Sequence, residues 1–313
     1  MTKFAVAGIT QLETIVEINS LPVRYVPVTS RRDFITSEPS GDAFNICLAL
    51  NWLEDTAELL TVVGKTQDMG VFNPPGRHAH VDTSHILPLM DYTPQKVVFY
   101  QDDEHTQIFE DMKDVNSVEY DIEEAEKVIS ECDFTVISNV GFCRPFLSIA
   151  KKHKKPIAVR VNNYRSENEK YNAEFLSAAS IIYFSNENLR NSPYDFIKEM
   201  SKKYTADIIL LGIDETDVLL FERSENIVVP YKKVTTIDRV NSHGAGNAFF
   251  SCFLHSYAAG KETTEAVRDA LLFASYNSGF KGASTGFLTP GELDKWRKLI
   301  WKDTGEPEST ING

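Results

Sequence analysis

A short glycine turn near residue 244 has the residue types that could bind an anion and stabilise its charge. The segment VNSHGAGNAFFSCFL, residues 240–254, places Gly244, Ala245 and Gly246 directly before an apolar run of helical character, and Gly260 follows as a natural helix stop. The amides at a helix start lack intrahelical partners and carry the positive end of the helix dipole, which favours a phosphate or a developing oxyanion. The same turn also occurs where a buried helix only needs close packing, so the motif alone leaves both interpretations open.

The elements that would position this turn follow an alternating pattern of strands and helices. The apolar runs are continuous rather than alternating, as expected of strands covered on both faces. The predicted strands are 4–9, 59–63, 134–138, 156–161, 181–184 and 207–213, and the predicted helices include 121–132, 144–155 and 195–204. This order predicts an α/β fold with a mostly parallel central sheet and helices on both faces. Ligands of such sheets bind beyond the carboxyl ends of the strands.

Two β-like stretches interrupt the alternation. Residues 13–40 are β-like and never helical, and residues 95–111 read as a hairpin around an acidic turn. Together they predict a small β lid over the cleft or a dimer surface. We therefore expect one α/β domain over residues 1–302, and the polar, turn-rich segment 303–313 predicts a frayed C-terminal tail.

Composition excludes several classes of protein. The formal net charge is -13, from 32 Lys+Arg against 45 Asp+Glu, so a phosphate backbone would be repelled and no nucleic-acid partner is expected. No segment reads as a membrane span or a signal peptide, and the 4 cysteines form no Cys-x-x-Cys pair; we expect a cytoplasmic protein with reduced thiols and no membrane partner. His78 and His80 have no third ligand at useful spacing, so no metal ligands are assigned. P-loop and Gly-x-Gly-x-x-Gly motifs are absent.

The order of the polar motifs along the chain resembles that of the ribokinase-like sugar kinases, the PfkB family. The motifs that carry the resemblance are EPSGDAFNICLAL (38–50), TVVGKTQDMGV (61–71), HVDTSHI (80–86), VNNYR (161–165), FSNENL (184–189) and TTIDRVNSHGAGNAF (235–249). The resemblance covers nearly the whole chain, including both β-like interruptions. It implies transfer of the γ-phosphoryl group of ATP, with Mg²⁺, to a hydroxyl of a sugar or sugar-like substrate.

The resemblance also implies roles for individual residues. The turn Gly244, Ala245 and Gly246 would form an anion hole for the transferred phosphoryl group, with Asn247 at the position of the catalytic base. The residues that would bind the sugar are Gln11, Glu13, Gly41, Asp42 and Asn45. The residues that would serve the nucleotide and its magnesium are Asn186, Gly212 and Asn277.

The sequence departs from the family pattern at several of these positions. Asn247 replaces the catalytic Asp, Leu189 replaces the Glu of the Asn-x-x-Glu segment, and Val161 replaces an Asp. The family has a Thr-x-Gly-x-x-Gly segment in the strand that adjoins the nucleotide. At the corresponding residues 210–215, Leu210 replaces the Thr and Glu215 replaces the second Gly. All but the change at Val161 fall on the parts that handle ATP and the proton.

The loss of a carboxylate at residue 247 has a calculable consequence. General-base assistance is worth about a hundred- to ten-thousand-fold in rate, or roughly 3–5 kcal/mol of barrier. Phosphoryl transfer tolerates the loss because its loose transition state depends mostly on positioning and charge stabilisation. The candidates for a substitute base are Asp42, Glu13 and His243. For each of them the sequence favours another interpretation: a helix cap, an acceptor for a sugar hydroxyl, and a solvated turn residue, respectively.

Three functions follow from these observations. The first is a sugar kinase. The second is a catalytically weakened family member that binds sugar or nucleotide as a sensor or partner subunit, which the altered positions favour. The third is a scaffold that binds no small molecule. The lid strands also predict a homodimer, since exposed sheet edges are stabilised when they are covered, and family members commonly pair through their lids.

Overall fold

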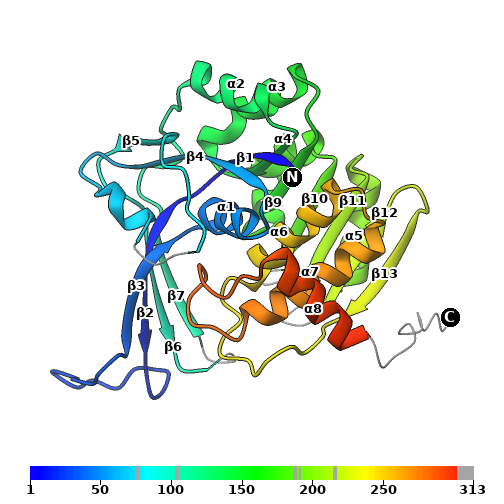
Figure 1. Ribbon diagram of the computed structural model, residues 1–313. Helices are drawn as coiled ribbons and strands as arrows, with labels where there is room; N and C mark the ends of the chain where they lie inside the picture. Colours follow the sequence, from blue (N-terminus) through cyan, green and yellow to red (C-terminus); the bar gives the residue numbers. More distant parts are fainter. Residues whose placement is uncertain (75–77, 103–105, 186–188, 190–191, 214–216, 302–313) are drawn as a thin grey trace.

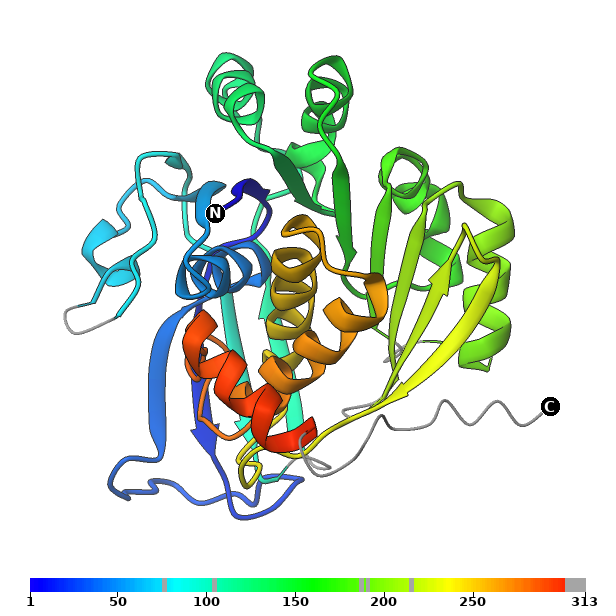
Figure 2. The same ribbon diagram turned by 45° about the vertical axis from the view of Figure 1, so that its right-hand side comes forward.

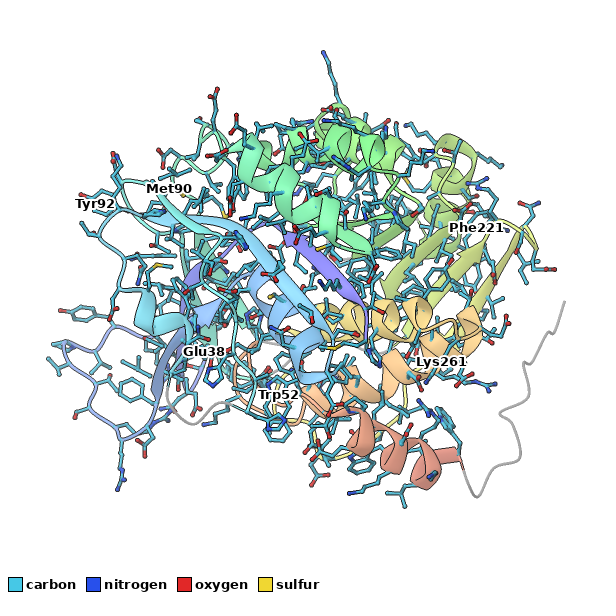
Figure 3. The ribbon with its side chains drawn as sticks, turned by 45° about the horizontal axis from the view of Figure 1, so that its top comes forward. Glu38, Trp52, Met90, Tyr92, Phe221 and Lys261 are labelled. Carbon is cyan, nitrogen blue, oxygen red and sulfur yellow. The ribbon has the colours of Figure 1, made fainter. Side chains whose placement is uncertain are left out.

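The main sheet of the computed structural model runs through the centre of the molecule (Figure 1). The structure describes residues 1–74, 78–102, 106–185, 189, 192–213 and 217–301. In spatial order the strands of this sheet are β13 (Ile227–Lys232), β12 (Asp217–Glu222), β11 (Ile208–Ile213), β10 (Ile181–Ser185), β9 (Ile157–Val161), β8 (Phe134–Ser138), β1 (Lys3–Ala7), β4 (Thr56–Gly64) and β5 (Ile86–Met90). Neighbours from β11 to β5 are parallel, whereas β12 pairs antiparallel with both β11 and β13. Met90 on β5 and Phe221 on β12 lie toward opposite sides of the molecule (Figure 3).

Helices cover both faces of this sheet and bury an apolar core on each. One face packs against α2 (Ile122–Glu131), α3 (Arg144–Lys152), α4 (Glu169–Ala178) and α5 (Pro193–Lys203). The other face packs against α1 (Asp42–Trp52), α6 (Ala245–Ala258), α7 (Thr263–Asn277) and α8 (Pro290–Trp301). Phe250 of α6 and Phe146 of α3 are fully buried representatives of the two cores. The predicted α/β architecture with helices on both faces is confirmed.

A second, smaller sheet projects from the first, as Figure 2 shows. Its strands lie in the order β3 (Ile35–Ser40), β2 (Gln11–Glu17), β6 (Gln95–Tyr100) and β7 (Thr106–Asp111). The β2–β6 pair is parallel and the other two pairs are antiparallel. Both β-like interruptions of the sequence therefore contribute to one sheet that could form a lid, although no strand is described within residues 18–34.

The two edge strands of the main sheet, β5 and β13, are absent from the predicted set. Each contains a proline, Pro88 and Pro230 respectively, and proline is tolerated in a sheet mainly at an edge because it cannot donate to the ladder. The antiparallel strand β12 joins β13 at that edge and is also outside the predicted set. The predicted tail, residues 303–313, lies outside the described residues. None of the helices in the described ranges is long and apolar enough to cross a membrane.

Glycines fix the starts of the two helices nearest the predicted site. Gly41 precedes α1 with φ of 110°, and a Cβ there would overlap the carbonyl oxygen of Ile9. Gly244 precedes α6 in the left-handed region with φ of 96°, and a Cβ there would lie 2.7 Å from the Cα of Ala283. Both positions therefore require glycine for backbone conformation and for close packing.

Candidate active site

The side chain of Asp42 connects the start of α1 by hydrogen bonds to the loops that follow β1 and β9. Its Oδ1 accepts hydrogen bonds from the backbone amides of Ile9 at 2.9 Å and Ala43 at 2.8 Å. Its Oδ2 accepts a hydrogen bond from the side-chain amide of Asn162. Both carboxylate oxygens are thus engaged at the carboxyl edge of the parallel strands, where ligands of such sheets bind. Asp42 is the first residue of α1 and Gly41 is its N-cap, so these contacts support a structural role for Asp42, though not as the cap itself, rather than a role as a base.

Glu13 is the centre of a buried polar cluster under the small sheet. Its side chain is fully buried, and its Oε2 lies 2.7 Å from Nε2 of His243 and 3.9 Å from Nζ of Lys96. The hydroxyl of Ser40 donates to the same Oε2 at 3.4 Å, and Asn45 donates to Ser40 at 3.2 Å. The structure therefore brings together β2, β6, the start of α1 and the turn before α6.

The charge state of Glu13 follows from this environment. Burial by itself raises the pKa of the Glu13 carboxyl. The positive charge that His243 carries when protonated and its hydrogen bond, with smaller contributions from Lys96 and Ser40, outweigh burial and hold the pKa below its ordinary value. Glu13 is therefore an ionised acceptor at neutral pH.

Several buried oxygens in this region have no donor within the described residues. They are Oε1 of Gln11, Oε1 of Glu13 and Oδ1 of Asn45. Gln11 and Glu13 lie on the same buried side of β2, and Gln11 is in register with Ser40, which contacts both Glu13 and Asn45. A buried acceptor without a donor is unfavourable, so these atoms are suited to a ligand with several hydroxyl groups.

The turn before α6 offers two open amides rather than three. The amide of Ala245 donates to the carbonyl of Ser242 at 3.0 Å, which corrects the expectation that this amide faces a ligand. The amides of Gly244 and Gly246 donate no hydrogen bond within the described residues. Asn247 lies in the first turn of α6 and is 8% exposed, and its Oδ1 has no partner there. The helix start thus retains unpaired donors at its positive end.

His243 is not a solvated turn residue, in contrast to one sequence interpretation. Only 19% of its side chain is exposed, and its Nε2 contacts Glu13. Its backbone amide donates to Oδ1 of Asn241 at 3.0 Å, which orders the turn. His243 therefore connects the buried polar cluster around Glu13 to Gly244 at the start of α6.

Gly212, which the sequence predicts to adjoin the nucleotide, and Gly246 both lie close to the side chain of Tyr183. A Cβ built on Gly212 would lie 2.8 Å from the Tyr183 hydroxyl, and a Cβ on Gly246 would lie 3.1 Å from it. The same Cβ on Gly246 would lie 3.5 Å from Nη2 of Arg160. Tyr183 stacks on Phe250 of α6, with ring centroids 5.3 Å apart. Gly212 and Gly246 therefore share one region of the molecule.

The remaining predicted nucleotide residues are distributed differently. Asn277 is the last residue of α7; it donates to the carbonyl of Thr285 at 2.6 Å, and its Oδ1 is buried without a partner. Asn186 and Glu215 lie outside the described residues. Leu189, at the position of the family's Glu, packs against the hydrophobic core.

Three residues near the site were not identified as site residues from the sequence: Lys96, Ser40 and Arg160. Lys96 faces Glu13 because it is the register partner of Glu13 across the β2–β6 pair. No local motif marks this pairing, since it depends on which strands become neighbours. Arg160 is a single charged residue within the apolar strand β9, and that interruption is the one sequence signal that could have drawn attention to it.

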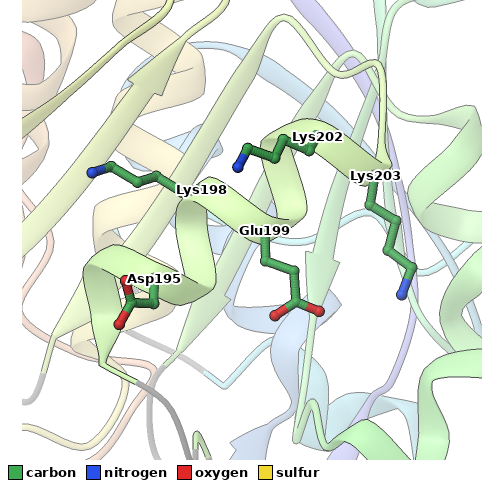
Figure 4. Close-up of a pocket in the computed structure, with 5 residues that line it drawn as sticks. All are labelled: Asp195, Lys198, Glu199, Lys202 and Lys203. Carbon is green, nitrogen blue, oxygen red and sulfur yellow. The ribbon is translucent and has the colours of Figure 1, made fainter.

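A hollow on the surface at α5 is not part of this site. It is lined by Asp195, Lys198, Glu199, Lys202 and Lys203. Figure 4 shows these side chains projecting in different directions from one helix, with no common point of convergence. We assign it no function.

Comparisons with known proteins bear on the family and the fold. A family model described as pfkB family carbohydrate kinase matches residues 1–289. A deoxyribokinase of Salmonella typhi is 26% identical over 109 residues, which are 34% of this chain and 35% of the relative, so the match spans about a third of that relative's length. A solved microbiome-derived acarbose kinase superimposes with a TM-score of 0.82 at 16% identity, covering 94% of this chain and 98% of its own. An Arabidopsis thaliana ribokinase complexed with ribose and ATP superimposes with a TM-score of 0.77 at 16% identity. The superposition covers 95% of this chain and 99% of the ribokinase chain.

Proposed function

Because the chain belongs to the pfkB family of carbohydrate kinases, we propose that it transfers the γ-phosphoryl group of ATP to a hydroxyl of a sugar or sugar-like substrate. The observation that supports this most directly is the junction at His243. Its ring contacts Glu13 in the buried polar cluster with Ser40 and Asn45, and its backbone continues into Gly244 at the start of α6. A hydroxyl held by the cluster would therefore lie near the helix start that binds a phosphate. Residues 1–302 would act as one catalytic domain beneath the lid.

The acceptor side is suited to a polyhydroxylated molecule. The unpaired oxygens of Gln11, Glu13 and Asn45 would accept hydrogen bonds from ligand hydroxyls. An ionised carboxylate makes the strongest of these hydrogen bonds, because charge-assisted bonds are about twice as strong as neutral ones. Gly41 and Asp42 would shape the same pocket by fixing the start of α1. The class of substrate is thus a sugar, and its identity is the subject of the experiment below.

The donor side would bind phosphate through backbone groups. The amides of Gly244 and Gly246 and the α6 dipole would stabilise the charge of the transferred group. Gly212 and Asn277 would adjoin the nucleotide. ATP supplies the phosphoryl group to be transferred, and the solved ribokinase neighbour is complexed with ATP.

Magnesium is proposed as an ion carried by the triphosphate rather than one held by a set of protein carboxylates. The described residues contain no group of three or more His, Cys, Asp or Glu that could hold a metal ion. Leu189 packs into the core where the family has a Glu, and Asn247 is neutral. Among the described residues no donor set therefore fits a protein-bound ion, and no step is assigned to one.

The pair Glu13–His243 would accept the proton of the attacking hydroxyl. An ionised carboxylate can only accept a hydrogen bond, so a neutral His243 would carry its proton on Nε2 in the 2.7 Å contact. This tautomer leaves Nδ1 with a lone pair, the arrangement of a general base oriented by a carboxylate. The substrate O–H proton would pass to Nδ1 as the new O–P bond forms and the bond to the departing ADP breaks. Asn247 would position the reacting groups without taking the proton.

Assembly and location complete the proposal. We propose a homodimer formed through the lid, because apolar side chains are exposed there: Val23, Tyr25, Val26, Val28, Ile108 and Phe109. Size-exclusion at micromolar concentration would show a dimer, and a monomer would remove this part of the proposal. The cytoplasm is the proposed location, supported by four free, buried cysteines. The net charge of -13 supports the absence of a nucleic-acid partner.

The second candidate is a family member that binds its ligands without turnover. The observations that favour it are the neutral Asn247 and the core-packed Leu189. Both functions predict binding of sugar and nucleotide, so only turnover separates them.

The deciding experiment is ATP consumption by the purified protein over a panel of pentoses, deoxypentoses, hexoses and nucleosides, with products identified by mass. The kinase predicts one phosphorylated product whose formation is abolished in Glu13→Ala. Lys152→Ala, a change on the exposed side of α3, is the matched control and should leave turnover unchanged. Binding of a sugar with no product from any member of the panel would instead support the weakened family member.

A further inference from the structure

Arg160 is a charged side chain on a strand that is otherwise apolar. On β9, Val159 and Val161 belong to the core beneath α2–α5, whereas Ala158 belongs to the core beneath α6. Because side chains alternate along a strand, Arg160 lies on the same face as Ala158, toward α6. No acidic side chain in the described part of the chain pairs with it. A cation is thus placed inside the α6 face of the sheet, and none of the described residues supplies its counter-charge.

The guanidinium is ordered by packing rather than by hydrogen bonds. Its carbon lies 5.1 Å from the centre of the Tyr183 ring, in a cation–π arrangement. Its Nε and Nη1 are buried, and no described residue offers them an acceptor. A Cβ built on Gly246 would lie 3.5 Å from Nη2 and 3.6 Å from Nη1, so the group abuts the first turn of α6. The residue as a whole is only partly buried, so a ligand can reach it.

Two positive features therefore meet at one point. Arginine is always protonated in proteins, and the start of α6 carries unpaired amides and the positive end of its dipole. A buried charge without a partner is costly, and a second positive feature beside it raises that cost. Two N–H donors of the guanidinium and the amide of Gly246 remain available to a single anion. An oxyanion with several acceptor oxygens would satisfy all of them.

We propose that Arg160 binds a phosphate oxyanion of the nucleotide donor, together with the Gly246 amide at the start of α6. This proposal rests on the proposed kinase function for the identity of the phosphate. The planar guanidinium would contact phosphate oxygens through two N–H groups, a geometry that Arg provides and Lys does not. It would supply positive charge in a site where Leu189 and Asn247 replace the acidic residues of the family pattern. A neutral residue at position 247 also leaves the guanidinium without a competing carboxylate from that residue.

Binding of inorganic tripolyphosphate, measured by calorimetry without sugar or metal, tests the anion site independently of turnover. We expect the native protein to bind tripolyphosphate and Arg160→Met to bind it about tenfold more weakly or worse, as expected when charge-assisted hydrogen bonds are lost. Arg160→Lys should recover only part of the affinity. Arg144→Met is the matched control: Arg144 also lies over aromatic rings, but it is paired with Glu174 and lies on α3. Its tripolyphosphate affinity should equal that of the native protein.

Stability distinguishes this role from a structural one. In the absence of ligand, Arg160→Met and Arg160→Gln should unfold at the same temperature as the native protein or higher, because each removes an unpaired cation. Tripolyphosphate should raise the unfolding temperature of the native protein and not of these variants. In turnover assays, Arg160→Met should lower kcat/KM for ATP by about a hundredfold and leave KM for the sugar unchanged. Loss of one hydrogen-bond donor to a developing oxyanion has an effect of about this size.

The outcomes separate the two proposals. Native affinity for tripolyphosphate in Arg160→Met, or no affinity in the native protein, overturns the anion site whether or not the protein is a kinase. A lower unfolding temperature of both variants without ligand, together with unchanged tripolyphosphate affinity, shows a structural role and overturns it as well. Arginine-dependent tripolyphosphate binding without turnover of any sugar supports the anion site and refutes the kinase function.

Discussion

Replacement of His243 by glutamine should slow phosphoryl transfer by about a hundredfold. The imidazole contacts a fully buried carboxylate at 2.7 Å, so its orientation is fixed by Glu13. Glutamine keeps a donor for Glu13 but has no group that accepts a proton at neutral pH. General-base assistance is worth about a hundred- to ten-thousand-fold, and the lower end applies because the transition state of phosphoryl transfer is loose. A hundredfold loss is about 2.7 kcal/mol of barrier.

The assay is kcat at saturating ATP and sugar, measured by ADP release for four proteins: native, His243→Gln, Asn247→Asp and the double variant. A carboxylate at residue 247 restores a base at the start of α6, where a negative charge is favoured by the dipole. We therefore expect Asn247→Asp alone to change kcat by no more than about threefold, because a base is already present. In the double variant it should recover at least about tenfold of the lost rate.

Two results would refute this reasoning. If His243→Gln keeps kcat within about threefold of native, the imidazole takes no proton in the rate-limiting step. If Asn247→Asp alone raises kcat by a hundredfold or more, the native protein lacks a functioning base. The KM for the sugar separates base chemistry from binding, since Glu13→Gln should raise KM and lower kcat together.

The remaining predictions concern stability and pH. Asp269→Asn should lower the free energy of unfolding, measured in urea, by about 2–3 kcal/mol. The Asp269 side chain is 1% exposed and pairs with Lys261 at 2.6 Å and Arg297 at 2.7 Å, but both cations are 27% exposed, so the loss should lie at or below the lower end of the range of about 3–5 kcal/mol for a fully buried pair. An unchanged urea midpoint would contradict this. Glu13 has a lowered pKa in the folded protein, so its contribution to stability is present above its unfolded pKa and lost as the pH falls through the folded pKa. The stability difference between native and Glu13→Gln should therefore shrink on acidification, and a difference that grows would show the opposite shift. Gly41→Ala should cost at least about 1 kcal/mol because φ is 110° there; thermal unfolding at the native temperature would be inconsistent with that strain.

Much of the fold could be predicted because its signal is local. Strands such as β1 and β10 are covered by helices on both faces, so each must be a nearly continuous apolar run, and that run is visible in the sequence. The edge strands β5 and β13 could not be recognised in this way, because each contains a proline, which an edge position tolerates. The strands β2 and β3 of the smaller sheet were expected as β structure, whereas the parallel pairing of β2 with β6 has no local signature.

The candidate site divides in the same way. By itself the sequence determined the glycine turn at residues 244–246, the helix that follows it and the neutral residue at position 247. These features depend on the backbone conformation and side-chain chemistry of residues that are adjacent in the chain. Only the tertiary structure decided that His243 contacts Glu13, 230 residues away, and that Arg160 abuts Gly246. Such contacts are set by the order of strands in the two sheets and by the packing of α6 on β10, and these depend on the whole core rather than on any one segment.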